Sequence, residues 1–368
     1  MRFGAVLALI FGGVVLIGAA PSHAALRSVA RNDSAAAARF IARVDSLRLA
    51  AKIPGLSVVV LRDTTVVLAR GLGYADVERR IPATPETPYV IASVTKPISA
   101  VVALRLVELG QLDLDRRMAT FAGFPEFCRD ARERGGIFFR DFECDTQPLT
   151  LRHLLSMTAN GAPGSRFFYN PVAYSWTSRP MAEVAKTPFS SLVAKYVFEP
   201  AGMNHSARTH RTLPLRPDLA EALAKPYGLD STNAIVPSAP PPPQGDGAAG
   251  GVTSTAMDMA RFDIALTQGR LLTRRSLEQM WTPARTPSGT TLPYGIGWFV
   301  TKVRGERVLW HTGLWEGAYS ALYLKVPGRN LSMILLANSD GLRWPGEVEE
   351  ALLDQSPFAS GFLADFGR

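Results

Sequence analysis

The sequence predicts a mixed α/β (α+β) fold with one α/β lobe and one inserted helical lobe. Runs rich in β-branched and aromatic residues occur near both ends of the chain, at about residues 55–76 and 307–339. Between these runs, helical patterns and loops predominate. We therefore expect an α/β lobe over about 25–90 and 256–368, and a helical lobe over about 91–255. A cleft between two lobes is the natural place for a ligand.

The first residues predict a secretory signal peptide. Arg2 precedes an apolar run over residues 5–20, and Ser22-His23-Ala24 fits the small-x-small cleavage rule. We expect residues 1–24 to be removed and residues 25–368 to form an exported protein, periplasmic or secreted. An uncleaved membrane anchor is the alternative, although the run is slightly short for a span of roughly 20 apolar residues. No later segment is long and apolar enough to cross a membrane.

The two cysteines, Cys128 and Cys144, predict a disulfide, because an exported chain permits one. A loop of this size contributes roughly 3 kcal/mol of stability in the chain-entropy account. A metal site is not expected, because no histidine pair or further cysteine lies near them and His153, His205, His210 and His311 lack ligand spacing. No cofactor is expected.

Composition and charge also limit the partners. Apolar residues make up 47% of the 368 residues and charged residues 20%, a balance typical of globular proteins. The net charge is +8, it comes mostly from scattered arginines, and about +7 remains without Arg2. No basic run interleaves with aromatic residues, so no nucleic-acid partner is expected. The charge suits a solvated surface in an anionic setting such as the cell envelope.

The N-terminal part of the α/β lobe predicts a helix followed by a hairpin. Residues 32–53 carry a helical apolar stripe, with Asp33 or Ser34 as the N-cap. The β-rich runs that follow are separated by Arg62-Asp63-Thr64, which indicates a turn between antiparallel strands.

The later segments complete the predicted order of elements. An amphipathic helix runs from Ser93 to near Gly110, and a short helix covers residues 149–159. The four prolines at 240–243 predict an extended loop rather than a linker. Three β-rich runs follow, "RVLWHTG", "AYSALYLKV" and "LSMILLANS", and "PGEVEEALLDQ" predicts a closing helix.

Ser93 and Lys96 form the single Ser-x-x-Lys pattern in the sequence. Positions i and i+3 share one face of a helix, so the hydroxyl and the amine can meet. A serine hydroxyl needs a base to become a nucleophile, and a lysine with a lowered pKa can serve. A helix N-terminus also offers N–H groups for an oxyanion. The alternative is an N-cap serine followed by an exposed lysine.

Two other segments carry candidate groups for the same chemistry. Tyr169 lies in a loop rich in glycine and proline, where a tyrosine near a lysine can act as a base. Its alternative role is packing beside Phe167 and Phe168. His311-Thr312-Gly313 lies on a β-rich run, where the threonine could bind a carboxylate or carbonyl and the glycine could let backbone approach a ligand. A structural role is the alternative for His311.

Together these segments resemble the serine β-lactamase and penicillin-binding-protein superfamily, most closely its class C β-lactamase-like branch. The resemblance covers roughly Pro54 to Asn338. The segments occur in the order of the family, and they are "ASVTKPISA", "LTLRHLLSMTANG", "PGSRFFYN", "GGVTSTAMDMARF", "YGIGWFV" and "HTG". The resemblance implies an antiparallel sheet flanked by helices, with an inserted helical lobe.

The resemblance also implies roles for individual residues. Ser93 would be the acylated nucleophile, Lys96 its partner base, and Tyr169 the general base and acid that moves the proton. His311, Thr312 and Gly313 would take the place of the third family motif. The backbone N–H groups of Ser93 and Leu314 would form the oxyanion hole.

The sequence departs from the family at two motifs. The family has Tyr-x-Asn where this chain has Tyr169-Asn170-Pro171, so Asn170 would have to contact substrate from a shifted loop, or the contact is absent. His311 stands where lysine is common, and histidine is neutral for much of the time near pH 7. Both departures weaken the case for an efficient β-lactamase, and we expect esters to be turned over faster than nitrocefin.

The resulting hypothesis is an exported serine hydrolase that cleaves amide, ester or β-lactam bonds in a small-molecule or peptide substrate, with peptidoglycan as a candidate source. D-Ala-D-Ala carboxypeptidase, esterase and weak β-lactamase activities all stay open. The alternative is a non-catalytic peptidoglycan- or envelope-binding protein on the same scaffold. An α/β-hydrolase is disfavoured, because the sequence has no Gly-x-Ser-x-Gly motif.

Overall fold

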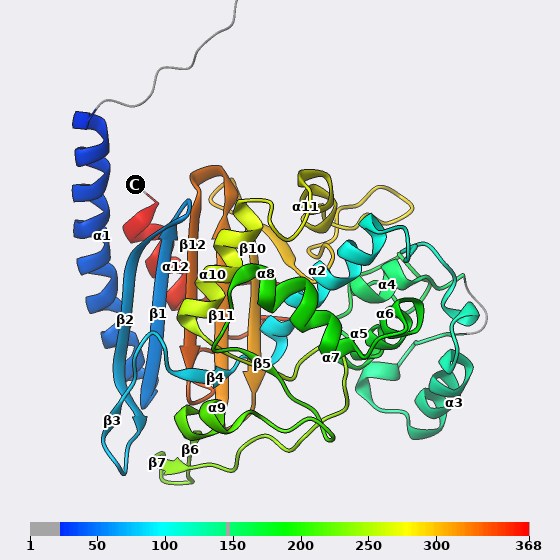
Figure 1. Cartoon of the computed structure of the whole chain (residues 1–368), viewed down its shortest axis with the longest axis horizontal. Helices are drawn as coiled ribbons and strands as arrows, with labels where there is room; N and C mark the ends of the chain where they lie inside the picture. Colours follow the sequence, from blue (N-terminus) through cyan, green and yellow to red (C-terminus); the bar gives the residue numbers. More distant parts are fainter. Residues whose placement is uncertain (1–22, 145–147, 368) are drawn as a thin grey trace, which may run out of the picture.

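The computed structural model describes residues 23–144 and 148–367 of the chain. Within them, a mixed α/β fold is built on a seven-stranded antiparallel sheet with the order β3-β2-β1-β12-β11-β10-β9 (Figure 1). The strands are β1 (Gly55–Arg62), β2 (Thr65–Asp76), β3 (Ile81–Pro82), β9 (Phe299–Val303), β10 (Glu306–Trp315), β11 (Tyr319–Val326) and β12 (Leu331–Ala337). The predicted fold class is confirmed.

Both ends of the chain contribute to this sheet, as the β-rich runs predict. β1 pairs with β2 across the predicted turn, where Asp63 adopts a φ of 55°. β1 also pairs with β12, which joins the N-terminal hairpin to the C-terminal strands. All three C-terminal β-rich runs form strands, so these predictions are confirmed.

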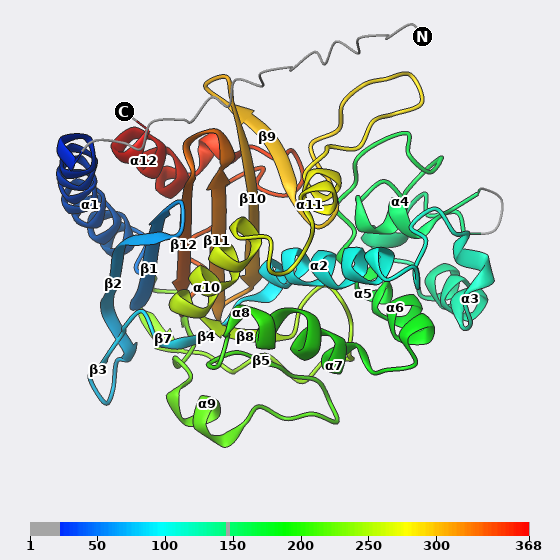
Figure 2. The same ribbon diagram turned by 45° about the horizontal axis from the view of Figure 1, so that its top comes forward.

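Helices cover the two faces of the sheet. α1 (His23–Ala50) and α12 (Pro357–Phe366) pack together on one face, where the Phe40 and Phe362 rings lie 5.7 Å apart (Figure 2). α10 (Ala256–Thr267) lies on the other face. The buried side chains between these layers form the core of this part of the molecule.

The remaining helices lie mostly beside the sheet (Figure 1). They are α2 (Thr95–Glu108), α3 (Phe124–Arg134), α4 (Leu151–Leu155), α5 (Pro171–Trp176), α6 (Ser178–Ala185), α7 (Phe189–Val193), α8 (Glu199–Ala201), α9 (Pro217–Ala222) and α11 (Arg274–Met280). The segment expected to be all-helical also holds short strands, namely β5 (Ala207–Arg208), β6 (Tyr227–Leu229), β7 (Ile235–Pro237) and β8 (Val252–Thr255). β8 pairs with β5 and with β4 (Pro88–Val90), so long-range pairing overrides the helical character of the segment.

Two predicted helix boundaries are wrong. α1 begins at His23, so neither Asp33 nor Ser34 is its N-cap, and Asp33 instead pairs with the Arg62 guanidinium at 2.6 Å. The closing helix is α12 rather than residues 345–355, because Gly346 and Ala351 adopt positive φ angles of 69° and 56° that interrupt a helix.

The disulfide between Cys128 and Cys144 is present, as predicted, with their Cα atoms 5.8 Å apart. Residues 1–22, which make up most of the predicted signal peptide, lie outside the described residues. Over 23–144 and 148–367, none of the helices has the length and apolar character needed to span a membrane.

Candidate active site

Ser93 lies in a tight turn between strand β4 and helix α2. Residues Ala92–Val94 form a 3-10 turn, and α2 begins at Thr95, so Val94 rather than Ser93 occupies the N-cap position. Ala92 has a φ of 44°, a left-handed conformation that is costly for a residue with a side chain. The turn brings the Ser93 side chain to the wall of a cavity.

Strand β10 packs directly against this turn at Gly313. A Cβ atom on Gly313 would overlap the backbone carbonyl of Ile91. Glycine therefore allows close approach of protein backbone at this position, rather than the approach of a ligand that the sequence led us to expect.

Lys96 lies one helical turn after Ser93, and its side chain is fully buried. Its Nζ atom is 2.7 Å from Ser93 Oγ, 2.8 Å from the Tyr169 hydroxyl and 3.2 Å from the Ala249 carbonyl oxygen. Burial holds the pKa of Lys96 well below its usual value, since the ammonium form loses its hydration. The amine is therefore available as a neutral base.

The three neighbours of this amine limit how hydrogen atoms can be arranged. A neutral lysine has two N–H donors and one lone pair, and the Ala249 carbonyl can only accept. One N–H and one lone pair then remain for the hydroxyls of Ser93 and Tyr169. One hydroxyl donates to the lone pair while the other accepts, and the hydroxyl that donates is the one whose proton the amine is placed to accept.

Tyr169 reaches this site from the loop before α5. Its ring stacks on Phe299 with a centroid separation of 5.9 Å. Burial of the hydroxyl raises the pKa of Tyr169, and a hydrogen bond with Ser93 offsets part of that rise. Tyr169 is therefore a protonated phenol at neutral pH, so the neutral Lys96 amine, with its lone pair, is the group of the two that can accept a proton.

Asn170 does not face the cavity. It is buried, and its Oδ1 accepts a hydrogen bond from Ala173 N at 2.9 Å as the N-cap of α5. Its amide nitrogen donates to Phe138 O and to Asn160 Oδ1 at 2.7 and 3.0 Å. Both amide hydrogens are engaged, so this geometry gives Asn170 a role in holding the Tyr169 loop and does not support the predicted contact with substrate.

His311 is fully buried on β10 beside Tyr169, with their ring centroids 6.1 Å apart. Its Nδ1 lies 2.6 Å from the Thr312 carbonyl oxygen, and its Nε2 lies 2.9 Å from the Tyr294 hydroxyl. These partners fit a neutral ring, with Nδ1–H donating and Nε2 accepting. Burial is the main cause that lowers the pKa of His311 well below its usual value, and Lys96 lowers it further whenever its amine is protonated.

Of the other two predicted residues on β10, Thr312 is buried and Leu314 lines the cavity. Thr312 is buried, and its hydroxyl donates to the Ala321 carbonyl at 3.2 Å. Leu314 lines the same cavity as Ser93. The structure thus brings Ser93, Lys96, Tyr169 and His311 together, with Leu314 at the cavity wall.

Arg208 is a buried residue of this region that the sequence did not single out. Its guanidinium donates to the carbonyls of Gly247 and Gly250 and lies 3.1 Å from Asp246 Oδ1. On the other side of the same loop, Ser99 Oγ donates to the Ala248 carbonyl at 2.6 Å. Arg208 therefore anchors the loop whose Ala249 carbonyl contacts Lys96.

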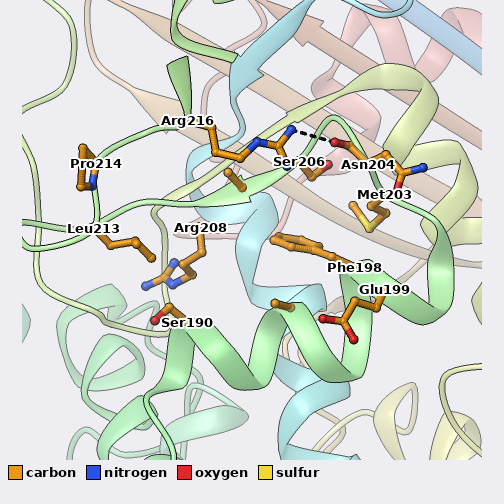
Figure 3. Close-up of a pocket in the computed structure, with 12 residues that line it drawn as sticks. Ser190, Phe198, Glu199, Met203, Asn204, Ser206, Arg208, Leu213, Pro214 and Arg216 are labelled. Atoms are coloured by element: carbon orange, nitrogen blue, oxygen red, sulfur yellow. Dashed lines mark hydrogen bonds between the residues drawn. The ribbon is translucent and has the colours of Figure 1, made fainter. Parts of the chain in front are cut away.

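The environment of Arg208 differs from that of its neighbour Arg216. Both lie on the wall of a second cavity (Figure 3). The Arg208 side chain is 2% exposed, whereas the Arg216 side chain is 49% exposed and pairs with Asp218. The glycines at 245, 247, 250 and 251 indicate a loop in the sequence. No pattern near them indicates that Arg208 binds this loop.

Within the described ranges, no group of three or more histidine, cysteine, aspartate or glutamate side chains is placed to hold a metal ion.

Comparisons with known proteins agree with this architecture. The family model described as Beta-lactamase matches residues 36–355. The putative penicillin-binding protein PbpX of Bacillus subtilis (strain 168) is 28% identical over 268 residues, which span 66% of this chain and 61% of that protein. The chain thus matches less than two thirds of that relative's length.

Solved structures show the same fold. The octameric penicillin-binding protein homologue from Pyrococcus abyssi aligns with a TM-score of 0.70 and 24% identity, covering 87% of this chain and 78% of that one. The class C β-lactamase from Rhodobacter sphaeroides aligns with a TM-score of 0.67 and 19% identity, covering 90% and 99%. With the match over residues 36–355, these findings show that the chain belongs to the β-lactamase family, within the serine β-lactamase and penicillin-binding-protein superfamily.

Proposed function

We propose that the protein is an exported serine hydrolase that forms an acyl-enzyme on Ser93 and cleaves an ester, amide or β-lactam bond. The observation that carries this proposal is the contact of one buried amine, that of Lys96, with both the Ser93 and the Tyr169 hydroxyls. A serine with such a base is an activated nucleophile.

Acylation follows from this arrangement. The Lys96 amine accepts the Ser93 proton as Oγ forms a bond to the substrate carbonyl carbon. The bond from that carbon to the leaving oxygen or nitrogen then breaks, and the leaving group takes a proton from the Tyr169 hydroxyl, which Lys96 reprotonates. The backbone N–H groups of Ser93 and Leu314 are the proposed donors to the oxyanion, and such donors can contribute about 3 kcal/mol each.

Deacylation reverses the proton path with water as the nucleophile. Water adds to the acyl carbon and gives its proton to the Lys96–Tyr169 pair, and the Ser93 Oγ leaves as it regains a proton. The products are a carboxylic acid and the free enzyme. His311 stays neutral throughout and acts by packing against Tyr169.

Export is supported by two features of the chain. The N-terminal residues have the pattern of a signal peptide, and Cys128 is joined to Cys144 in a disulfide, a bond favoured in oxidising compartments. The resemblance to a putative penicillin-binding protein makes a cell-wall peptide one of the substrates to test beside esters.

The test is hydrolysis of p-nitrophenyl acetate, nitrocefin and a D-Ala-D-Ala peptide by the wild-type protein and by Ser93→Ala. We expect turnover of at least one substrate and its loss in the variant, with an unchanged circular dichroism spectrum. Equal turnover by the folded variant would refute the proposal. Binding of peptidoglycan fragments without turnover of any substrate would favour the non-catalytic alternative.

A further inference from the structure

The cavity beside Ser93 has walls that are mostly apolar. Its volume is about 560 Å³, and it is open to the surface. Among the residues that line it are Val90, Leu215, Leu223, Leu314, Trp315 and the four prolines at 240–243. A pocket of this kind gains affinity by removing apolar surface of a ligand from water.

The cavity offers a substrate carboxylate no lysine or arginine partner. No lysine, arginine, aspartate or glutamate side chain lines it. His210 does line it, but its Nε2 already lies 4.0 Å from the Asp246 carboxylate. Close by, His311 is a neutral ring whose two nitrogens are bound to Tyr294 and Thr312. A carboxylate entering this space would exchange its hydration for neutral donors such as Ser175, Thr209 and Gln244, without gaining a lysine or arginine partner.

The proline wall also restricts recognition of peptides. Proline has no backbone N–H, so the residues at 240–243 cannot donate hydrogen bonds to an extended peptide. Their fixed backbone and pyrrolidine rings instead present a stiff apolar surface. This wall favours packing over hydrogen bonding.

We propose that this cavity is the acyl site and that it selects neutral esters with an uncharged, apolar acyl group larger than acetyl. The inference rests on the proposed acyl-enzyme at Ser93. It names the prolines at 240–243, with Leu215 and Leu223, as the residues that determine specificity. Such substrates gain from burial in the cavity, whereas carboxylate-bearing β-lactams and D-Ala-D-Ala peptides do not.

The test compares p-nitrophenyl esters that differ only in the acyl group. We expect kcat/KM to rise by about fourfold per methylene from acetate through butanoate to hexanoate. The p-nitrophenyl half-ester of adipic acid, which matches hexanoate in length but ends in a carboxylate, should be slower than hexanoate by on the order of 100-fold. A flat series, or equal rates for hexanoate and the half-ester, would overturn the proposal.

A charge placed at the rim tests the location of the acyl group. Val172 lines the cavity and is 37% exposed, so the Val172→Arg variant should fold. The added positive charge should reduce the ratio of kcat/KM for hexanoate to kcat/KM for the half-ester by roughly two- to fivefold. This ratio is the gap that the control must leave unchanged. The matched control is Leu49→Arg on α1, which is 61% exposed and outside the cavity lining. The gap should be unchanged in this control. An unchanged gap in Val172→Arg would place the acyl group elsewhere.

A fluorophosphonate probe separates failure of this inference from failure of the proposed function. If the probe does not label Ser93 and no ester is hydrolysed, the acyl-enzyme proposal fails and the acyl-site assignment fails with it. If Ser93 is labelled and the esters are hydrolysed without preference for apolar chains, only the acyl-site assignment fails.

Discussion

Lys96 Nζ lies 2.7 Å from Ser93 Oγ and 2.8 Å from the Tyr169 hydroxyl, in a position where no part of the lysine side chain reaches solvent. Burial lowers the pKa of the amine and raises the pKa of the phenol. The two shifts leave both groups uncharged at neutral pH. These shifts support the proposal that Lys96 is the base of the site and that Tyr169 relays the proton.

Replacement of the phenol tests this division of roles. Tyr169→Phe keeps the ring stacked on Phe299 and removes the hydroxyl, so we expect kcat to fall by about 100-fold or more with little change in KM. The measurement is steady-state hydrolysis of p-nitrophenyl butanoate. Because Lys96 remains, the fluorophosphonate should still label Ser93. A kcat within threefold of wild type would show that Tyr169 does not relay the proton.

The pH dependence of kcat/KM for an uncharged ester should show an acid limb set by Lys96. The neutral amine is the active form, so the rate rises with pH through the lowered pKa of Lys96. No loss from Tyr169 is expected below pH 10, because the pKa of its phenol is raised. Glu347, whose pKa burial raises to about 7, is a second group that can produce an acid limb, so its replacement provides the control. The fall in kcat/KM at acidic pH should persist in Glu347→Gln. If that fall disappeared in this variant, the titrating group would be the Glu347 carboxylate and not Lys96.

Lys96→Met should abolish turnover and stabilise the fold. A buried amine with a lowered pKa is protonated in the unfolded chain at neutral pH but neutral in the folded protein, so folding must release a proton. Stability therefore rises with pH from the lowered pKa up to the usual value near 10.5. We expect the free energy of unfolding at pH 7 to be higher by about 1–2 kcal/mol in Lys96→Met, with a flatter pH dependence.

Urea unfolding at several pH values measures this difference. A variant less stable than wild type at pH 7 would contradict a neutral, destabilising Lys96.

Arg208 should act on catalysis through the loop that carries Ala249. Arg208→Lys keeps a positive charge but cannot span the carbonyls of Gly247 and Gly250 together, so the Ala249 carbonyl is released from Lys96 and water enters. We expect a lower kcat and an acid limb shifted to higher pH, since hydration restores the pKa of Lys96. The matched control is Arg216→Lys, an exposed side chain on the same cavity wall.

The Arg216→Lys control should leave both kcat and the acid limb of the pH profile unchanged. An Arg208→Lys enzyme that keeps the wild-type pH profile while losing only thermal stability would reduce Arg208 to a structural residue.

Reduction of the disulfide should destabilise the fold. Cys128 and Cys144 are separated by 16 positions, and closure of a loop of this size contributes about 3 kcal/mol. A lower melting temperature is expected in the presence of dithiothreitol and, independently, in the Cys128→Ser, Cys144→Ser double variant. Identical melting curves with complete reduction, verified by thiol titration, would contradict this expectation.

The sequence predicts those parts of the fold that depend on local patterns. The β1–β2 hairpin and strands β10, β11 and β12 follow from alternating or continuous β-rich runs with clear turn residues. The closing helix is misplaced because residues 345–355 have a helical composition, whereas Ser356 as N-cap and Pro357 at the first position favour a later start.

The candidate site shows the same limit. Ser93 and Lys96 are found from sequence because their relation is local, at i and i+3. Asn170-Pro171 also carries a local signal, an N-cap before a first-position proline, which explains why the Asn170 amide is engaged in α5 rather than facing the cavity. The Arg208 anchor depends on a loop about 40 residues away, and the partners of His311 include Tyr294 on a different segment. Contacts of this kind are set by tertiary packing and leave no local pattern.

The most direct test of the central claim is mass spectrometry of the protein quenched with acid during turnover of p-nitrophenyl hexanoate. The account predicts an adduct of one hexanoyl group on the peptide that contains Ser93, absent from Ser93→Ala and longer-lived in Tyr169→Phe. Hexanoate release by the wild-type protein with the adduct on another residue, or at an undiminished rate in Ser93→Ala, would contradict it.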